Sequence, residues 1–190
     1  MLANWFSTTL SGCSVNPEIT LSIVSDNSTA ILSMIRQADL DIGFIGTDAI
    51  SSDLDAIPCW HDEIVVIAAP HSSAAVQPMN VSDKREFVVR EDGSATRQHI
   101  EKFLRSRGLS TTTAMTVSSP EAVKRYVAAG IGWGFASRHS VATEVATGQL
   151  EIVHIEGWNC RRTFYAVLRN GYRLSESQAS FVELAKALDQ

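Results

Sequence analysis

Three side chains that could hold an anion stand close together near the middle of the chain: Ser94, Thr96 and Arg97. The apolar run 87–89 precedes them and a helical pattern of apolar residues follows, so the sequence predicts a strand, a tight turn and a helix that begins here. Ser94 is the expected N-cap. The free amides of the first turn, the two hydroxyl groups and the guanidinium would then face one small volume, which the helix dipole makes attractive to an oxyanion.

A purely structural role is the alternative for the same residues. Ser94 and Thr96 could only cap their helix, because hydroxyl side chains at a helix start bond to the nearby backbone. Arg97 could pair with Glu91 or Glu101 at the surface, where an ion pair contributes about 0–1 kcal/mol. The local sequence leaves both interpretations open.

Two other helices also begin at polar residues. Asn27 and Ser28 precede one of them, and Ser118 and Ser119 precede the other, whose first helical residue is a proline. The loop that contains Thr47 follows a short apolar run. In open α/β sheets ligands bind beyond the carboxyl ends of the strands, so we expect these polar beginnings to contribute to one ligand site.

Strands that alternate with helices along the whole chain predict an α/β fold. The run 63–69 is almost continuously apolar, which is typical of a strand covered on both faces. A capping-box pattern at Ser175 opens the last helix. The predicted strands cover 19–24, 42–45, 63–69, 86–90, 112–117, 131–136, 150–155 and 162–168, with a short run at 54–57; helices are predicted over 3–12, after 28, over 95–107, 120–129 and 138–146, and from 176 to 188.

Composition and residue spacing exclude several classes of function. The net charge of -5 argues against this chain gripping a nucleic-acid backbone alone. Three scattered cysteines, with no signal peptide and no membrane-spanning run, favour a cytoplasmic protein. We expect no metal, no cofactor and no enzymatic activity, because the sequence lacks metal-ligand spacing, a dinucleotide fingerprint and a paired nucleophile and base. A redox-responsive Cys160, whose pKa Arg161 and Arg162 would lower, is an open alternative.

Five segments, taken in order, resemble the effector-binding domain of LysR-type transcriptional regulators. They are Leu40-Asp41-Ile42-Gly43-Phe44-Ile45-Gly46, residues 60–71, Arg90-Glu91-Asp92-Gly93-Ser94-Ala95-Thr96-Arg97, Ser119-Pro120-Glu121-Ala122-Val123-Lys124 and residues 130–136. The resemblance implies a two-lobed fold similar to type 2 periplasmic binding proteins, with mixed sheets and two crossing strands as the hinge. The first lobe would comprise 1–68 plus 164–190, and the second lobe 69–163.

The resemblance also implies a function and a set of ligand contacts. A small effector, which we expect to be anionic, would bind in the cleft between the lobes and act by rearranging the lobes and the oligomer. The expected partners are the effector and further copies of the chain in a homodimer or homotetramer. We expect no binding to a membrane. By position, the implied effector contacts are Asn27, Ser28, Gly46, Thr47, Ser94, Thr96, Arg97, Ser118 and Gly132.

Two departures from the family pattern concern the start of the chain. Family members bind DNA through an N-terminal winged helix-turn-helix, and we expect that domain, and with it any DNA contact, to be absent from this chain. The strand that opens the first lobe is also expected to be missing. A solute-binding protein of a transport system, which would share the fold, is the alternative function.

Overall fold

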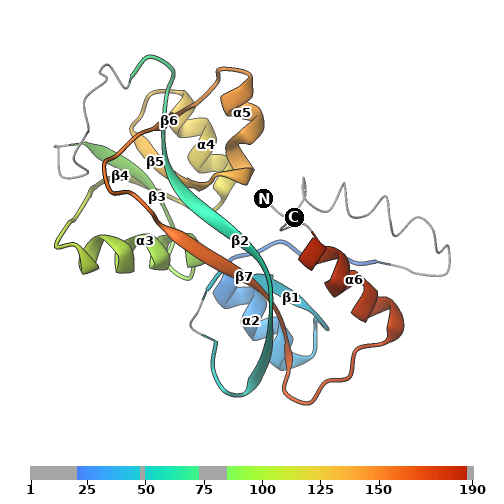
Figure 1. Ribbon diagram of the computed structural model, residues 1–190. Helices are drawn as coiled ribbons and strands as arrows, with labels where there is room; N and C mark the ends of the chain where they lie inside the picture. Colours follow the sequence, from blue (N-terminus) through green and yellow to red (C-terminus); the bar gives the residue numbers. More distant parts are fainter. Residues whose placement is uncertain (1–20, 48–49, 73–84, 188–190) are drawn as a thin grey trace. The chain divides into compact units, whose positions relative to one another are not determined.

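The chain divides into two compact units, and two strands contribute residues to both. Unit 1 comprises residues 1–61 and 163–190, and unit 2 comprises residues 62–162. The computed structural model describes residues 21–47, 50–72 and 85–187 (Figure 1). The shared strands are β2 (Leu54–Ala68) and β7 (Arg161–Arg169). The helix predicted over 3–12 lies outside the described residues.

Within its described residues, unit 1 is built on three strands with a helix on each face. β1 (Gly43–Ile45) pairs antiparallel with β7, and β7 is the neighbour of β2. Because successive residues of a strand face opposite sides, Ile45 packs with helix α2 (Ser28–Gln37) while Phe44 packs with helix α6 (Glu176–Lys186). The aromatic rings of Trp60 and Phe164 stack at 4.6 Å on the α6 side.

The start of unit 1 differs from the sequence prediction. We predicted a strand over 19–24, but residues 21–24 form no strand, and the side chains of Leu21, Ile23 and Val24 are exposed. Apolar alternation favours a strand only where a neighbouring strand can complete the ladder. No strand of the described part of the chain pairs with these residues. The helix that follows begins as predicted, with Asn27 as its N-cap.

Unit 2 contains a mixed sheet, which confirms the prediction of mixed sheets. β3 (Glu86–Arg90) lies parallel to β4 (Thr112–Val117) and to β5 (Trp133–Ser137). β2 pairs antiparallel with β5 and with β6 (Glu151–Val153). The strand order within this unit is β2-β5-β3-β4, with β6 on β2.

Two helices cover opposite faces of the unit 2 sheet. Helix α3 (Ala95–Ser106) buries Ile100 and Leu104 against Phe87 and Phe135, whose rings stack at 4.7 Å. Helix α4 (Pro120–Ala128) buries Val123 and Val127 on the side of Val88. Both faces of the central strands are therefore apolar, as the continuous apolar run of β2 predicted.

Two other predicted elements are organised differently in the structure. β2 is one strand of fifteen residues, where the sequence predicted a strand only over 63–69 after a separate short run. Cys59 and Trp60 join the two parts because their side chains are buried in the core of unit 1. The predicted helix 138–146 is a 3-10 turn, η1 (His139–Val141), followed by the short helix α5 (Ala142–Ala146). None of the helices within the described ranges is long and apolar enough to cross a membrane.

Candidate functional site

The start of α3 is the most buried of the polar helix beginnings that the sequence identified. Gly93, with a φ of 87°, makes the turn after β3, because a positive φ is accessible to glycine without steric cost. Ser94 is the N-cap, as predicted, and its Oγ accepts a long hydrogen bond of 3.5 Å from the Arg97 amide. The side chains of Ser94 and Thr96 are both buried, with only 2% and 7% of these residues exposed.

Hydrogen-bond donors remain unused at this helix start. The amides of Ala95 and Thr96 belong to the first turn, where an α-helix has no internal acceptor. Neither amide has an acceptor within the described ranges of the chain. The Oγ of Ser94 and the Oγ1 of Thr96 both accept hydrogen bonds from protein groups, so the proton of each hydroxyl is still available to donate.

The donor to Thr96 is Arg162, a residue of the second strand shared by the two units. Its Nη1 donates to Thr96 Oγ1 at 2.9 Å, and its Nε and Nη2 contact Asp62 Oδ2 at 2.9 and 2.7 Å. Asp62 Oδ1 accepts from the Ser137 hydroxyl at 2.7 Å. Only 1% of each charged side chain of the pair is exposed. Burial lowers the pKa of Arg162, and the neighbouring Asp62 carboxylate opposes this shift.

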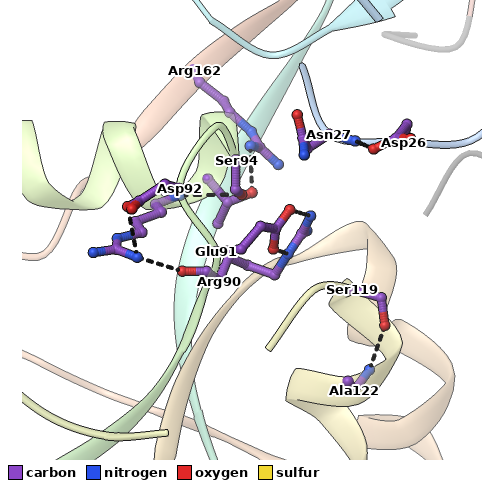
Figure 2. Close-up of polar contacts among 11 residues, drawn as sticks. Asp26, Asn27, Arg90, Glu91, Asp92, Ser94, Ser119, Ala122 and Arg162 are labelled. Atoms are coloured by element: carbon purple, nitrogen blue, oxygen red, sulfur yellow. Dashed lines mark hydrogen bonds and ion pairs between the residues drawn. The ribbon is translucent and has the colours of Figure 1, made fainter. Parts of the chain in front are cut away.

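Arg97 forms ion pairs with carboxylates, as the purely structural interpretation of the sequence predicted for Glu101. Its Nε donates to Glu101 at 2.8 Å. Its Nη1 lies 2.9 Å from Asp92 and donates to the Arg90 carbonyl at 3.2 Å (Figure 2). The hydrogen bond to Glu101, opposed by partial burial and supported by Asp92, raises the pKa of Arg97. These acidic partners neutralise Arg97, so its charge is less available to a ligand than the sequence suggested.

A second ion pair lies beside Arg97. The Arg90 guanidinium donates from Nε and Nη2 to the two carboxylate oxygens of Glu91, at 2.7 and 2.8 Å (Figure 2). This two-point geometry is the one in which an arginine is most firmly oriented by a carboxylate. The charges around the α3 start therefore largely cancel, and hydroxyl and amide donors are what remains for an anion.

A cavity of about 290 Å³ lies in unit 2, between α3 and the β3–β4 edge of the sheet. Its floor is apolar and includes Ile100, Leu104 and Phe135. Thr96 and Arg97 are the two of the nine predicted contacts that line it. The cavity is thus continuous with the α3 start on the helix side.

The other two predicted contacts of unit 2 occupy different environments. Ser118 is exposed, and the neighbouring Ser119 caps α4 by accepting from the Ala122 amide at 3.1 Å (Figure 2). Gly132 has a structural requirement, because a Cβ at this position would lie 2.7 Å from the Glu86 carbonyl oxygen of β3. Close approach of the two backbones therefore accounts for this glycine without a ligand.

The four predicted contacts of unit 1 occur at two places. Asn27 Oδ1 accepts from the Ala30 amide at 3.0 Å, so the amide nitrogen of its side chain is not used in the cap. Ser28 is the half-buried first residue of α2. Gly46 and Thr47 are buried directly after β1. Each pair thus lies at an element end, as the sequence indicated.

Sequence reasoning missed the roles of Arg162 and Asp62, although the strand pattern carried a signal. Arg162 is in phase with the buried Phe164 and Ala166 of β7, and Asp62 is in phase with Ile64 of β2. A charged residue on the buried face of a strand requires a partner of opposite charge. The alternation could therefore have identified each residue as buried, but not its partner.

The proposal of a reactive Cys160 is wrong. Burial raises the pKa of its thiol to about 11, and the nearby Arg162 lowers it only in part. Cys160 is 1% exposed within the core beneath α3. Across residues 21–47, 50–72 and 85–187 there is no cluster of three or more histidine, cysteine or acidic side chains that could hold a metal ion.

Comparison with known proteins identifies the family. The family model described as the LysR substrate binding domain matches residues 13–190. The RuBisCO operon transcriptional regulator of Allochromatium vinosum is 32% identical over 160 residues, which is 83% of this chain and 53% of that protein. The chain spans about half the length of the curated regulators it matches.

Solved structures show the same fold. The regulatory domain of Synechocystis CcmR, solved in complex with 2-PG, matches with a TM-score of 0.85 at 24% identity, over 99% of this chain and 93% of that one. The effector-binding domain of QuiR, solved in complex with shikimate, matches with a TM-score of 0.81 at 16% identity, over 98% and 90%. The fold is therefore the α/β fold of type 2 periplasmic binding proteins, in a family of regulator domains rather than of enzymes. The chain belongs to the LysR substrate-binding domain family, the effector-sensing domains of LysR-type transcriptional regulators.

Proposed function

We propose that this domain senses a small anionic effector, whose charged group binds at the start of α3. The carrying observation is that Ser94 and Thr96, each more than nine-tenths buried, use their oxygens as acceptors toward the protein and keep their protons for a ligand. With the two free amides of the first turn, these protons form a set of donors. An acceptor-rich group such as a carboxylate, sulfate or phosphate complements such a set.

The three arginines beside the α3 start are neutralised. Arg97, Arg90 and Arg162 are each paired with a carboxylate, so these three residues supply little nonspecific attraction for an anion. Recognition would then depend on directed hydrogen bonds, which select for geometry as well as charge. Asn27, Ser28, Gly46, Thr47, Arg97, Ser118 and Gly132 remain proposed effector contacts. For Gly132 and Arg97, the structural roles described above weaken that assignment.

Two solved relatives support a small ligand for this family fold. The CcmR regulatory domain was solved in complex with 2-PG, and the QuiR domain in complex with shikimate. We propose that an effector changes the oligomer in which the domain acts, a homodimer or homotetramer in the cytoplasm, and thereby the DNA contacts of a complete regulator. An effector can do this only to the extent that it binds one arrangement more tightly than another.

Isothermal titration calorimetry of Thr96 variants tests the proposal. The probes are inorganic sulfate, inorganic phosphate, 2-PG and shikimate. Thr96→Val removes the hydroxyl while keeping the shape, and we expect it to weaken the binding of an anionic probe about tenfold or more, as for a lost hydrogen bond to a charged group. Thr96→Ser keeps the hydroxyl and should retain most of the affinity.

Thr116→Val is the matched control, because Thr116 is an exposed threonine of β4 outside the cavity. It should leave affinity unchanged. Equal affinity of wild type and Thr96→Val for a probe that binds the domain would refute the proposed site. An uncharged ligand that binds more tightly than every anion would refute the proposed effector class.

A further inference from the structure

Arg162 contacts the proposed effector site through its hydrogen bond to Thr96, while its ion pair with Asp62 requires no contact with the ligand. Arg162 is fixed by two contacts to Asp62, at 2.9 and 2.7 Å, and Asp62 is fixed in turn by Ser137. Figure 2 shows the Arg162 guanidinium extending toward the start of α3, beside Ser94. The donor to Thr96 is therefore rigidly placed.

The chemistry of the two partners determines the polarity of Thr96. A guanidinium carries five N–H donors and no acceptor, whereas a hydroxyl can donate once and accept twice. When Arg162 Nη1 donates to Thr96 Oγ1 at 2.9 Å, the threonine oxygen can only be the acceptor in that bond. Its proton must then point elsewhere. Since Arg162 stays charged at any physiological pH, this polarity does not reverse.

We propose that Arg162 is the positioning residue that fixes Thr96 as a hydrogen-bond donor, and that it thereby makes the site selective for fully deprotonated oxyanions. This inference rests on the proposed function. A ligand oxygen that carries no proton matches the fixed donor. A ligand that presents its own O–H or N–H along the direction of the Thr96 proton meets a second donor, and it can bond to Thr96 only at the one acceptor position that Arg162 leaves open.

The ion pair between Asp62 and Arg162 connects Thr96 to the two strands that the units share. Asp62 and Arg162 are the first and last residues of unit 2, one on each strand that is shared with unit 1. Thr96, Arg162 and Asp62 therefore form a hydrogen-bonded chain that joins the start of α3 to the two shared strands.

The first experiment needs no ligand. The side-chain rotamer of Thr96 is measured by NMR, from three-bond couplings to its methyl carbon, in wild type and in the double variant Asp62→Asn, Arg162→Met. The double variant removes both charges together, so no lone buried charge remains to unfold the domain. We expect one fixed rotamer in wild type and averaged couplings in the double variant. An unchanged fixed rotamer would overturn the inference.

The second experiment compares sulfate with inorganic phosphate in mildly alkaline buffer, where both are mainly dianions but only phosphate keeps a proton. Wild type should bind sulfate more tightly. In the double variant both acceptor positions of Thr96 are open to phosphate, so the ratio of sulfate to phosphate affinity should fall about fivefold or more, the effect of one hydrogen bond. The variant leaves the net charge of the protein unchanged, so a change in overall charge does not account for this shift.

Combining Thr96→Val with the Asp62→Asn, Arg162→Met change gives a double-mutant cycle. In the Thr96→Val background the affinity ratio should no longer respond to the Asp62→Asn, Arg162→Met change, because the hydroxyl through which it acts is gone. A ratio that still responds would show that the pair acts by another route and would overturn the inference. If neither anion binds wild type, the proposed anion site fails, while the rotamer measurement still decides whether Arg162 positions Thr96.

Discussion

Asp62 and Arg162 are one hundred residues apart in sequence, and their side chains form an ion pair of 2.7 Å that is almost completely shielded from water. The pair joins the two strands at which the chain enters and leaves unit 2. Strong attraction at low dielectric offsets the cost of removing both charges from water only when the geometry is good and the other donors and acceptors of the pair form hydrogen bonds. Here Ser137 donates to Asp62, and Thr96 accepts from Arg162.

Breaking this pair from one side should destabilise the domain severely. Arg162→Met leaves Asp62 charged and buried beside Ser137 alone, and we expect the free energy of unfolding to fall by about 3–5 kcal/mol. Urea denaturation followed by circular dichroism measures it. The double variant Asp62→Asn, Arg162→Met is the control, and its free energy of unfolding should fall clearly less than that of Arg162→Met. A single variant within about 1 kcal/mol of wild type would contradict the assignment of a tight buried pair.

Cys160 should resist thiol reagents in the folded protein. Its pKa of about 11 lies two units above the ordinary 9.0, so the reactive thiolate is roughly a hundredfold rarer at pH 8. Labelling with iodoacetamide, followed by peptide mass spectrometry, assigns the reaction to each cysteine. The same protein in urea is the control and should label at Cys160 fully. Rapid labelling in the native state would contradict the burial of this thiol.

The contacts of Lys124 should make stability depend on acid pH. Lys124 Nζ contacts Glu144 at 2.7 Å, Glu121 at 2.8 Å and the Ser140 carbonyl oxygen at 3.1 Å. Burial raises the pKa of Glu144, but the hydrogen bond from Lys124, a backbone hydrogen bond and the charge of Lys124 together more than offset this, and the net pKa lies below the usual 4.5. A lowered folded-state pKa stabilises the fold above pH 4.5, and this contribution is lost as the pH falls through the folded value.

Glu144→Gln should therefore lose about 1 kcal/mol of stability at neutral pH and show a flatter decline below pH 4.5 than wild type. Urea denaturation at a series of pH values measures both effects. Glu183→Gln is the matched control, because Glu183 pairs with Lys186 at the exposed surface of α6. It should change little. Identical pH profiles of Glu144→Gln and wild type would contradict the predicted role of this contact.

Gly132→Ala should damage the fold of unit 2, whatever its role toward a ligand. The new Cβ would lie 2.7 Å from the Glu86 carbonyl oxygen, which is backbone and cannot rotate away. We expect the free energy of unfolding, measured by urea denaturation, to fall by about 1–3 kcal/mol, as for other overpacked sites. Ser118→Ala, at an exposed position of the same unit, should stay within about 0.5 kcal/mol of wild type. A fully stable Gly132→Ala protein that fails to bind a probe would instead favour a direct ligand role.

The helix starts could be predicted from sequence because their determinants are local. Ser94, Ser119 and Ser175 each accept from an amide three residues further along the chain, so the cap and its partner lie within one turn. The predicted alternation also located β3, β4 and β7 to within a residue or two. The strand predicted at 19–24 failed over its described residues, because apolar alternation does not say whether a partner strand is present.

The order of most elements, the helix caps and the family pattern can be read from the amino-acid sequence alone, because each depends on residues that are close together in the chain. The contact of Arg162 with Thr96, and the neutralisation of Arg97 by Asp92 and Glu101, become visible only in the folded protein. The physical reason is that a buried charge specifies the need for a partner but not its identity. Strand register and helix packing, which bring residues 62, 96 and 162 together, make that choice.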